Sequence, residues 1–137
     1  MIIKDFLNLD FNKTEGKGTM PVAPENCTAL GFLYGGAALA TSVEVMEAVA
    51  ERPAAWVTTQ FVSFANSPGT LDLEANTSAK GRNISHCNMK AEVDGQVVFQ
   101  ALGSFGSRPA EVSIDWAKMP DVDKPEDCPK FLSLIHI

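Results

Sequence analysis

Two adjacent glycines, Gly35 and Gly36, precede a long stretch without glycine or proline, and their position could support catalysis. Backbone N–H groups in the first turn of a helix have no partner within the helix. Without side chains in the way, such groups can stabilise a carbonyl oxygen that gains negative charge. A steric explanation stands beside this one, because glycine also lets a helix start lie close to a strand. Tyr34, directly before the pair, is expected to offer its ring for packing or ligand contact rather than to act as an acid.

Other polar side chains could complete such a site. Gln60 and Ser63 fall in a stretch that should form a strand lining the helix, where a polar side chain needs a hydrogen-bonding partner. Gln60 could orient a water molecule, although a simple hydrogen bond to the helix start or a neighbouring strand is the favoured explanation. Glu44 is a candidate carboxylate. Its spacing of three and four from Glu47 and Glu51 favours a shared solvent-exposed strip instead.

A second group of candidates lies in an expected hairpin turn. Arg82 and Asn83 follow Gly81 there, and an arginine fork suits a phosphate group. An ordinary exposed turn is the alternative, since turns are solvated by default. His86 should lie on the outer face of its strand, so we expect no serine-histidine-aspartate set. The sequence contains no recognisable metal-ligand cluster, and we expect neither a metal nor a cofactor.

One long helix should position the glycine pair. Alanine, leucine, methionine and glutamate favour a helix over 33–50, which Pro53 must end. Leu39 and Val43 are expected on its buried face. The rest of the chain favours an α+β fold, an antiparallel sheet of about five to six strands wrapped around this central helix. The expected strands are 13–22 at the sheet edge, 56–64 at its centre, and 70–80, 84–93 and 97–105.

Composition limits the possible functions. The chain of 137 residues is 45% hydrophobic and 20% charged, which fits one globular domain, expected over residues 1–106. A formal net charge of -6 argues against binding to nucleic acid through a basic surface. The sequence has no apolar run long enough to suggest a signal peptide or membrane insertion. Three cysteines without paired spacing predict reduced thiols in a cytoplasm.

The character of the chain changes after residue 106. Residues 107–131 are rich in proline and acidic side chains and predict an interdomain linker or arm. Trp116 and Met119 are expected to pack back onto the domain or onto whatever follows it. Residues 132–137 match the translation of a transposon-end sequencing adapter. We therefore interpret them as a scar, and expect a second domain to be missing from this sequence.

Five motifs in order carry a family resemblance, and they span about residues 5 to 131. The order of a strand, a long helix and four strands resembles the hotdog fold. Together with this order, the motifs resemble the N-terminal half of the acyl-CoA thioesterase II family, whose members carry two hotdog domains in one chain. The motifs are Leu33–Gly36, Phe61–Gly69, Gly81–Ser85, Ser104–Gly106 and Met119–Pro129.

This resemblance implies hydrolysis of acyl-CoA thioesters to free acid and CoA, in fatty acid metabolism. The family's catalytic aspartate, threonine and glutamine belong to the C-terminal domain, so none maps onto this chain. Single-domain relatives carry a carboxylate about two turns beyond the glycines, where Val43 stands here. The candidate catalytic residues are Gly36, Gln60 and Glu44. The candidate substrate-binding residues are Tyr34, Gly35, Gly36, Ser63, Arg82 and Asn83, with Arg82 facing a coenzyme A phosphate.

A second hypothesis comes from another functional class. The domain could be a noncatalytic acyl-CoA-binding or dimerisation module that pairs with a second hotdog domain, in cis or as a homodimer. A hotdog hydratase ranks third, because residues 51–55 lack the aspartate-histidine pair that it would need.

Overall fold

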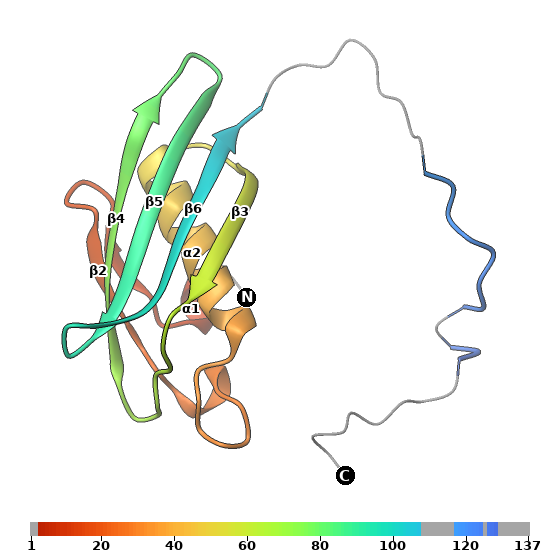
Figure 1. Ribbon diagram of the computed structural model, residues 1–137, viewed down its shortest axis with the longest axis horizontal. Helices are drawn as coiled ribbons and strands as arrows, with labels where there is room; N and C mark the ends of the chain where they lie inside the picture. Colours follow the sequence, from red (N-terminus) through yellow and green to blue (C-terminus); the bar gives the residue numbers. More distant parts are fainter. Residues whose placement is uncertain (1–2, 108–116, 125, 129–137) are drawn as a thin grey trace.

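The computed structural model describes residues 3–107, 117–124 and 126–128. The chain forms one six-stranded antiparallel sheet that curls around a long helix (Figure 1). The elements in chain order are α1 (Ile3–Phe6), β1 (Asp10–Asn12), β2 (Lys17–Pro21), η1 (Pro24–Asn26), α2 (Gly35–Ala50), β3 (Ala54–Phe61), β4 (Thr70–Lys80), β5 (Ile84–Val93) and β6 (Gln96–Gly106). This is the α+β hotdog architecture expected from the sequence.

The central helix α2 begins and ends close to where the sequence predicts. Its last turn closes when Glu51, in a left-handed conformation with φ of 53°, donates its N–H to the Glu47 carbonyl. The buried face differs from the prediction, because Leu39 is 42% exposed and Val43 is only partly buried. Small residues occupy the buried face instead, and they let the sheet approach the helix closely. The buried residues are Ala37, Ala38, Thr41, Ser42, Val45, Met46 and Ala50.

The sheet order is β1-β2-β4-β5-β6-β3, so β3 lies at one edge. The prediction of a central strand over 56–64 is therefore wrong. Within the described residues β3 pairs with β6 alone, and most of its side chains are exposed. Aromatic and β-branched residues favour any strand and do not distinguish the edge from the centre. The predicted edge strand, β2, is also covered, because the three-residue β1 pairs outside it.

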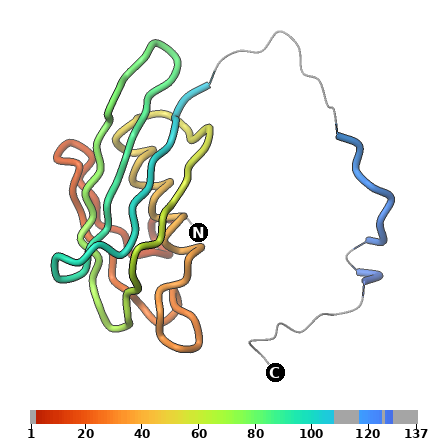
Figure 2. Tube along the Cα trace, viewed as in Figure 1, coloured from red at the N-terminus to blue at the C-terminus, as the bar shows by residue number. Residues whose placement is uncertain are grey.

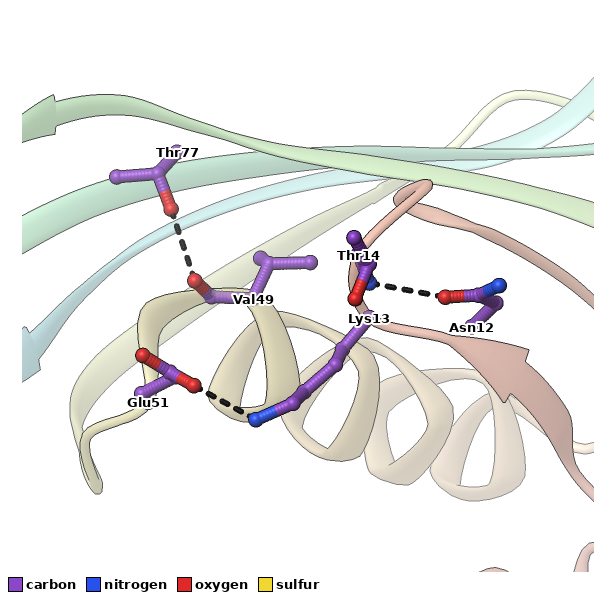
Figure 3. Close-up of polar contacts among 6 residues, drawn as sticks. All are labelled: Asn12, Lys13, Thr14, Val49, Glu51 and Thr77. Carbon is purple, nitrogen blue, oxygen red and sulfur yellow. Dashed lines mark hydrogen bonds and ion pairs between the residues drawn. The ribbon is translucent and has the colours of Figure 1, made fainter.

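Polar contacts fasten the C-terminal end of α2 to the sheet. Lys13 Nζ lies 2.6 Å from a Glu51 carboxylate oxygen, and Thr77 Oγ1 donates to the Val49 carbonyl at 3.2 Å (Figure 3). The hydrogen bond from Lys13, followed by its charge, lowers the pKa of Glu51. Glu47 accepts the Ala54 N–H at 2.7 Å, which ties the helix to the first residue of β3.

The described residues after 107 add nothing to the sheet. Residues 117–124 and 126–128 contain no helix or strand (Figure 2). Met119 is 85% exposed, so the expectation that it packs onto the domain is wrong. Trp116 and the predicted scar at 132–137 lie outside the described residues. No helix in the described ranges is long and apolar enough to cross a membrane.

The close contact between β6 and β3 depends on Gly103. A Cβ atom added there would lie 2.6 Å from the Trp56 carbonyl oxygen and 3.0 Å from Val57 Cγ2. We predict that Gly103→Ala lowers the free energy of unfolding by about 1–3 kcal/mol, because the strand backbone must move. Denaturant unfolding measures this loss. Leu102→Ala, at a neighbouring side chain that is 52% exposed, should cost less. Equal stability of Gly103→Ala and wild type would contradict the contact.

Candidate active site

The start of α2 presents two free backbone donors. The Tyr34 N–H donates a hydrogen bond to the Asn26 carbonyl at 2.9 Å, and the N–H groups of Ala37 and Ala38 both donate to the Tyr34 carbonyl. Between them, the N–H groups of Gly35 and Gly36 have no acceptor among the described residues. The sequence prediction of free donors at this pair agrees with this geometry. Two adjacent donors at the positive end of a helix can hold a carbonyl oxygen that becomes negative.

The steric explanation for these glycines is weak within this domain. A Cβ atom on Gly35 would lie 3.4 Å from Phe61 Cζ, which is an ordinary contact. A Cβ atom on Gly36 would lie 2.5 Å from Tyr34 Cε1, but that ring belongs to a residue that is 61% exposed and can turn away. Neither glycine is therefore required by a neighbouring backbone. Their small size leaves the two N–H groups open to another molecule.

An apolar surface adjoins the helix start. Phe61, at the end of β3, lies 3.4 Å from where a Cβ atom of Gly35 would be, and its side chain is 56% exposed. Phe32 and Phe64 meet edge to face, with their ring centroids 5.4 Å apart. Exposed aromatic rings grouped in this way are unusual on a surface that faces only water. The other exposed apolar residues of the same two loops are Leu30 and Val62.

A cavity of about 360 Å³ lies on another side of the helix start, between α1, η1 and α2. Its walls are mainly apolar, and Gly36 and Asn26 both border it. Asn26 is 2% exposed, and neither atom of its side-chain amide has a hydrogen-bonding partner in the described structure. Burial, followed by the Glu25 charge, raises the pKa of the neighbouring Cys27 thiol. The cavity lining is Ile3, Phe6, Leu7, Glu25, Asn26, Cys27, Tyr34, Gly36, Ala37 and Ala40.

Sequence reasoning missed Asn26. In the sequence, residues 24–27 indicate only a turn, since proline and asparagine are common turn formers. A buried asparagine cannot be told from an exposed one by residue type alone. The nearest usable signal was its position shortly before the glycine pair.

Gln60 does not lie beside the helix start. Phe61 faces α2, and side chains alternate along a strand, so Gln60 points to the opposite face of the sheet. There it accepts a hydrogen bond from Gln100 Nε2 at 2.9 Å. The expectation that the Gln60 side chain faces the helix is therefore wrong, whereas its hydrogen bond to the neighbouring strand β6 confirms the favoured explanation. Ser63 follows the end of β3 in the loop and accepts a hydrogen bond from Gln96 Nε2 at 3.3 Å.

The acidic stripe of α2 has mainly structural contacts. Glu47 binds the Ala54 N–H and Glu51 binds Lys13, as described above. Glu44 is partly buried and lies eight residues beyond Gly36, which is about 12 Å along the helix axis. A carboxylate at that distance cannot hydrogen-bond to a group held by the Gly36 N–H.

Arg82 and Asn83 lie at the other end of α2. Arg52 follows that helix and donates to the carbonyls of Gly81 and Arg82 at 3.0 and 3.2 Å. Because α2 has 16 residues, this turn is about 24 Å from the glycine pair. The structure therefore does not bring Arg82 and Asn83 together with Gly36. His86 is exposed on the outer face, as predicted, and its Nδ1 lies 2.9 Å from Ser104 Oγ.

Comparison with known proteins supports a thioesterase relationship. Residues 23–106 match the family described as the acyl-CoA thioesterase N-terminal domain. No curated protein matches the chain. A structure described as a thioesterase from Novosphingobium aromaticivorans is similar, with 29% identity and a TM-score of 0.79 over 88% of this chain. Only 49% of that chain is covered, so the present sequence spans about half its length.

Two further structures show the same relationship of lengths. A hot dog fold protein of unknown function from Alicyclobacillus acidocaldarius is 25% identical, with a TM-score of 0.73, over 96% of this chain and 49% of its own. The tesB protein of Mycobacterium avium subsp. paratuberculosis is 21% identical, with a TM-score of 0.77, over 90% of this chain and 48% of its own. The latter likeness shows the fold.

The packing around Gly35 yields a direct test of the steric explanation. We predict that Gly35→Ala keeps or raises the free energy of unfolding, by up to about 1 kcal/mol, because alanine favours a helix and its Cβ has room. Thermal or denaturant unfolding measures this change. A loss larger than about 1 kcal/mol would mean that packing against Phe61 explains the glycine.

Proposed function

Because the chain belongs to the family of acyl-CoA thioesterase N-terminal domains, we propose that it is the N-terminal hotdog half of an enzyme that hydrolyses acyl-CoA thioesters. The products are the free acid and CoA. The observation that carries this proposal is the pair of free N–H groups at Gly35 and Gly36, which lie beside apolar surface. A thioester needs such donors at its carbonyl oxygen and an apolar surface for its acyl chain.

In the proposed reaction, the thioester carbonyl oxygen accepts hydrogen bonds at the start of α2. Water then attacks the carbonyl carbon, the oxygen becomes negative, and the bond to sulfur breaks as the tetrahedral intermediate collapses. The group that takes the proton from water is supplied by a second hotdog domain in this proposal. Among the described residues, Gln60 lies on the wrong face and Glu44 too far along the helix to serve.

The second domain would pair with the free edge of β3. An unpaired strand edge is a template for another strand, and exposed apolar side chains along it favour burial. Trp56 and Phe61 on β3 are 49% and 56% exposed, and Leu39 on the adjoining helix is 42% exposed. A second domain in cis covers this surface in the longer protein, and a second copy of this chain takes its place here.

Arg82 and Asn83 keep a place in the proposal as a phosphate subsite. Their distance from Gly36 means that they would serve a coenzyme A whose thioester is held by the partner domain. Tyr34 would contribute its exposed ring to the substrate-binding rim. The free Cys27, Cys87 and Cys128 fit a reducing cytoplasm.

The alternative is a noncatalytic module that binds acyl-CoA or only a partner. In the described chain, Gln60 faces away from Gly36 and Glu44 lies about 12 Å along the helix, which favours this alternative for the isolated domain. Free donors at a helix start favour the enzyme for the longer protein.

Hydrolysis separates the two functions. We predict that a panel of acyl-CoA esters is cleaved by a longer chain containing both domains, and not by these 137 residues alone, when released thiol is trapped with a dye. In the longer chain, Gly35→Ala should lower kcat/KM by about tenfold or more, because its methyl group crowds the donors. Hydrolysis by neither protein would favour the binding module.

Association tests the exposed β3 edge. At micromolar concentration we predict a particle of twice the 14.7 kDa mass of the chain by light scattering. Phe61→Lys should shift it towards monomer, because a charge at an edge opposes pairing. Leu102→Lys is the matched control, since Leu102 is 52% exposed but lies on the outer face of the sheet. A monodisperse wild-type monomer would refute self-association.

A further inference from the structure

Asn26 is the one asparagine in the described chain whose side chain is buried with both amide atoms unpartnered. Its backbone is fixed, since its N–H reaches the Ala23 carbonyl and its own carbonyl accepts the Tyr34 N–H, both at 2.9 Å. The side chain therefore stays beneath the helix start. A buried amide without partners costs free energy, roughly 1–3 kcal/mol for each unsatisfied group. Such a group requires an explanation beyond the fold.

The cavity that Asn26 borders can hold a ligand. Its volume of about 360 Å³ falls in the range of small-molecule sites. Apolar side chains of residues 3–7 and alanines of α2 form much of its wall, and Gly36, whose N–H is free, borders the same space. Ordered water needs several polar partners, which such walls seldom offer. Glu25 contributes a negative charge to the wall, so a neutral ligand suits the cavity better than a carboxylate.

We propose that this cavity binds a neutral segment of the substrate that both donates and accepts hydrogen bonds, and that Asn26 recognises it. The proposal rests on the proposed function and adds the chemistry of the substrate. The Asn26 amide offers two N–H donors and one carbonyl acceptor, and all are unused. A thioester carbonyl alone accepts and cannot satisfy the Asn26 oxygen. The matching group is a hydroxyl or an amide next to the thioester.

Two parts of an acyl-CoA carry such a group near the thioester. The acyl chain can bear a hydroxyl at its third carbon, and the cysteamine end of coenzyme A bears an amide. With the thioester carbonyl at the Gly36 N–H, either group lies a few bonds away. Three thioesters distinguish them: hexanoyl-N-acetylcysteamine, its 3-hydroxy derivative, and S-butyl thiohexanoate, which has neither group.

The test measures binding, so it does not depend on turnover. The three thioesters are titrated into the 137-residue chain, and the NMR signals of the Asn26 side-chain amide are followed. We expect the N-acetylcysteamine ester to bind about tenfold more tightly than the S-butyl ester if the amide is recognised. A further gain for the 3-hydroxy ester identifies the hydroxyl as the recognised group. Equal binding of all three overturns the proposal.

Replacing Asn26 with leucine gives an independent readout. Asn26→Leu should remove the preference among the esters and also raise the thermal midpoint of the unliganded chain, by about 2–6 °C, because it removes an unsatisfied buried amide. A lower midpoint with unchanged binding would mean that interior water satisfies a purely structural residue. Binding with selectivity but no hydrolysis by the longer chain would retain this inference and reject the thioesterase.

Two further variants control the experiment. Ala40→Leu should fill the cavity from its α2 wall and weaken binding of all three esters while leaving Asn26 intact. Asn76→Leu replaces an exposed amide that already has a partner in Asn88, at 3.0 Å. It should leave binding unchanged and should not stabilise the chain. Tight binding to Ala40→Leu would place the ligand elsewhere and overturn the assignment.

Discussion

The structure depends on close contact between a helix face of small residues and a curved sheet. Ala37, Ala38, Thr41 and Ser42 bring α2 close to the strands, and the two hydroxyls return hydrogen bonds to carbonyls one turn earlier. Larger side chains on this face would hold the sheet away. With these small residues against the sheet, Leu39 points outward, towards the side where β3 has no further neighbour.

The orientation of α2 about its axis also determines which surfaces adjoin the helix start. Once the small residues face the sheet, Gly35 lies under Phe61 and Gly36 borders the cavity above Asn26. One helix end thus connects an exposed aromatic surface with a half-open, mainly apolar pocket. The two regions suit different parts of a thioester substrate. The domain provides donors and walls, and among the described residues Glu25 is the one acid that lines the cavity beside Gly36.

The sequence predicts the architecture well and the details of exposure poorly. The uninterrupted run of helix formers, the turn signals and the alternation of β4 and β5 predict α2 and β3 to β6 with small boundary errors. The strand expected over 13–22 covers only Lys17–Pro21, and β1 was not expected. The edge position of β3 could not be predicted, because its aromatic and β-branched residues are typical of a buried strand. In our proposal, a second hotdog domain buries this edge. Gln60 was misplaced by the same assumption.

The candidate site likewise combines features that the sequence predicts with features that only the structure shows. Free donors at Gly35 and Gly36 follow from elementary helix geometry, so the sequence was sufficient for them. Asn26 required coordinates, since an unsatisfied amide is defined by what surrounds it. Arg82 was a reasonable phosphate ligand by residue type, but only the length of α2 shows how far it lies from the glycines.

The open edge of β3 also bears on how such a protein is made. Ribosomes add about 5–20 residues per second, and domains tend to fold as they emerge, N-terminal part first. In the proposed two-domain protein, this half would complete its sheet and then wait several seconds for its partner. During that interval, nascent chains on one messenger RNA would expose identical unpaired β3 edges to each other. The order of synthesis therefore makes protection of β3 by a chaperone, or rapid translation of the second domain, a selective advantage.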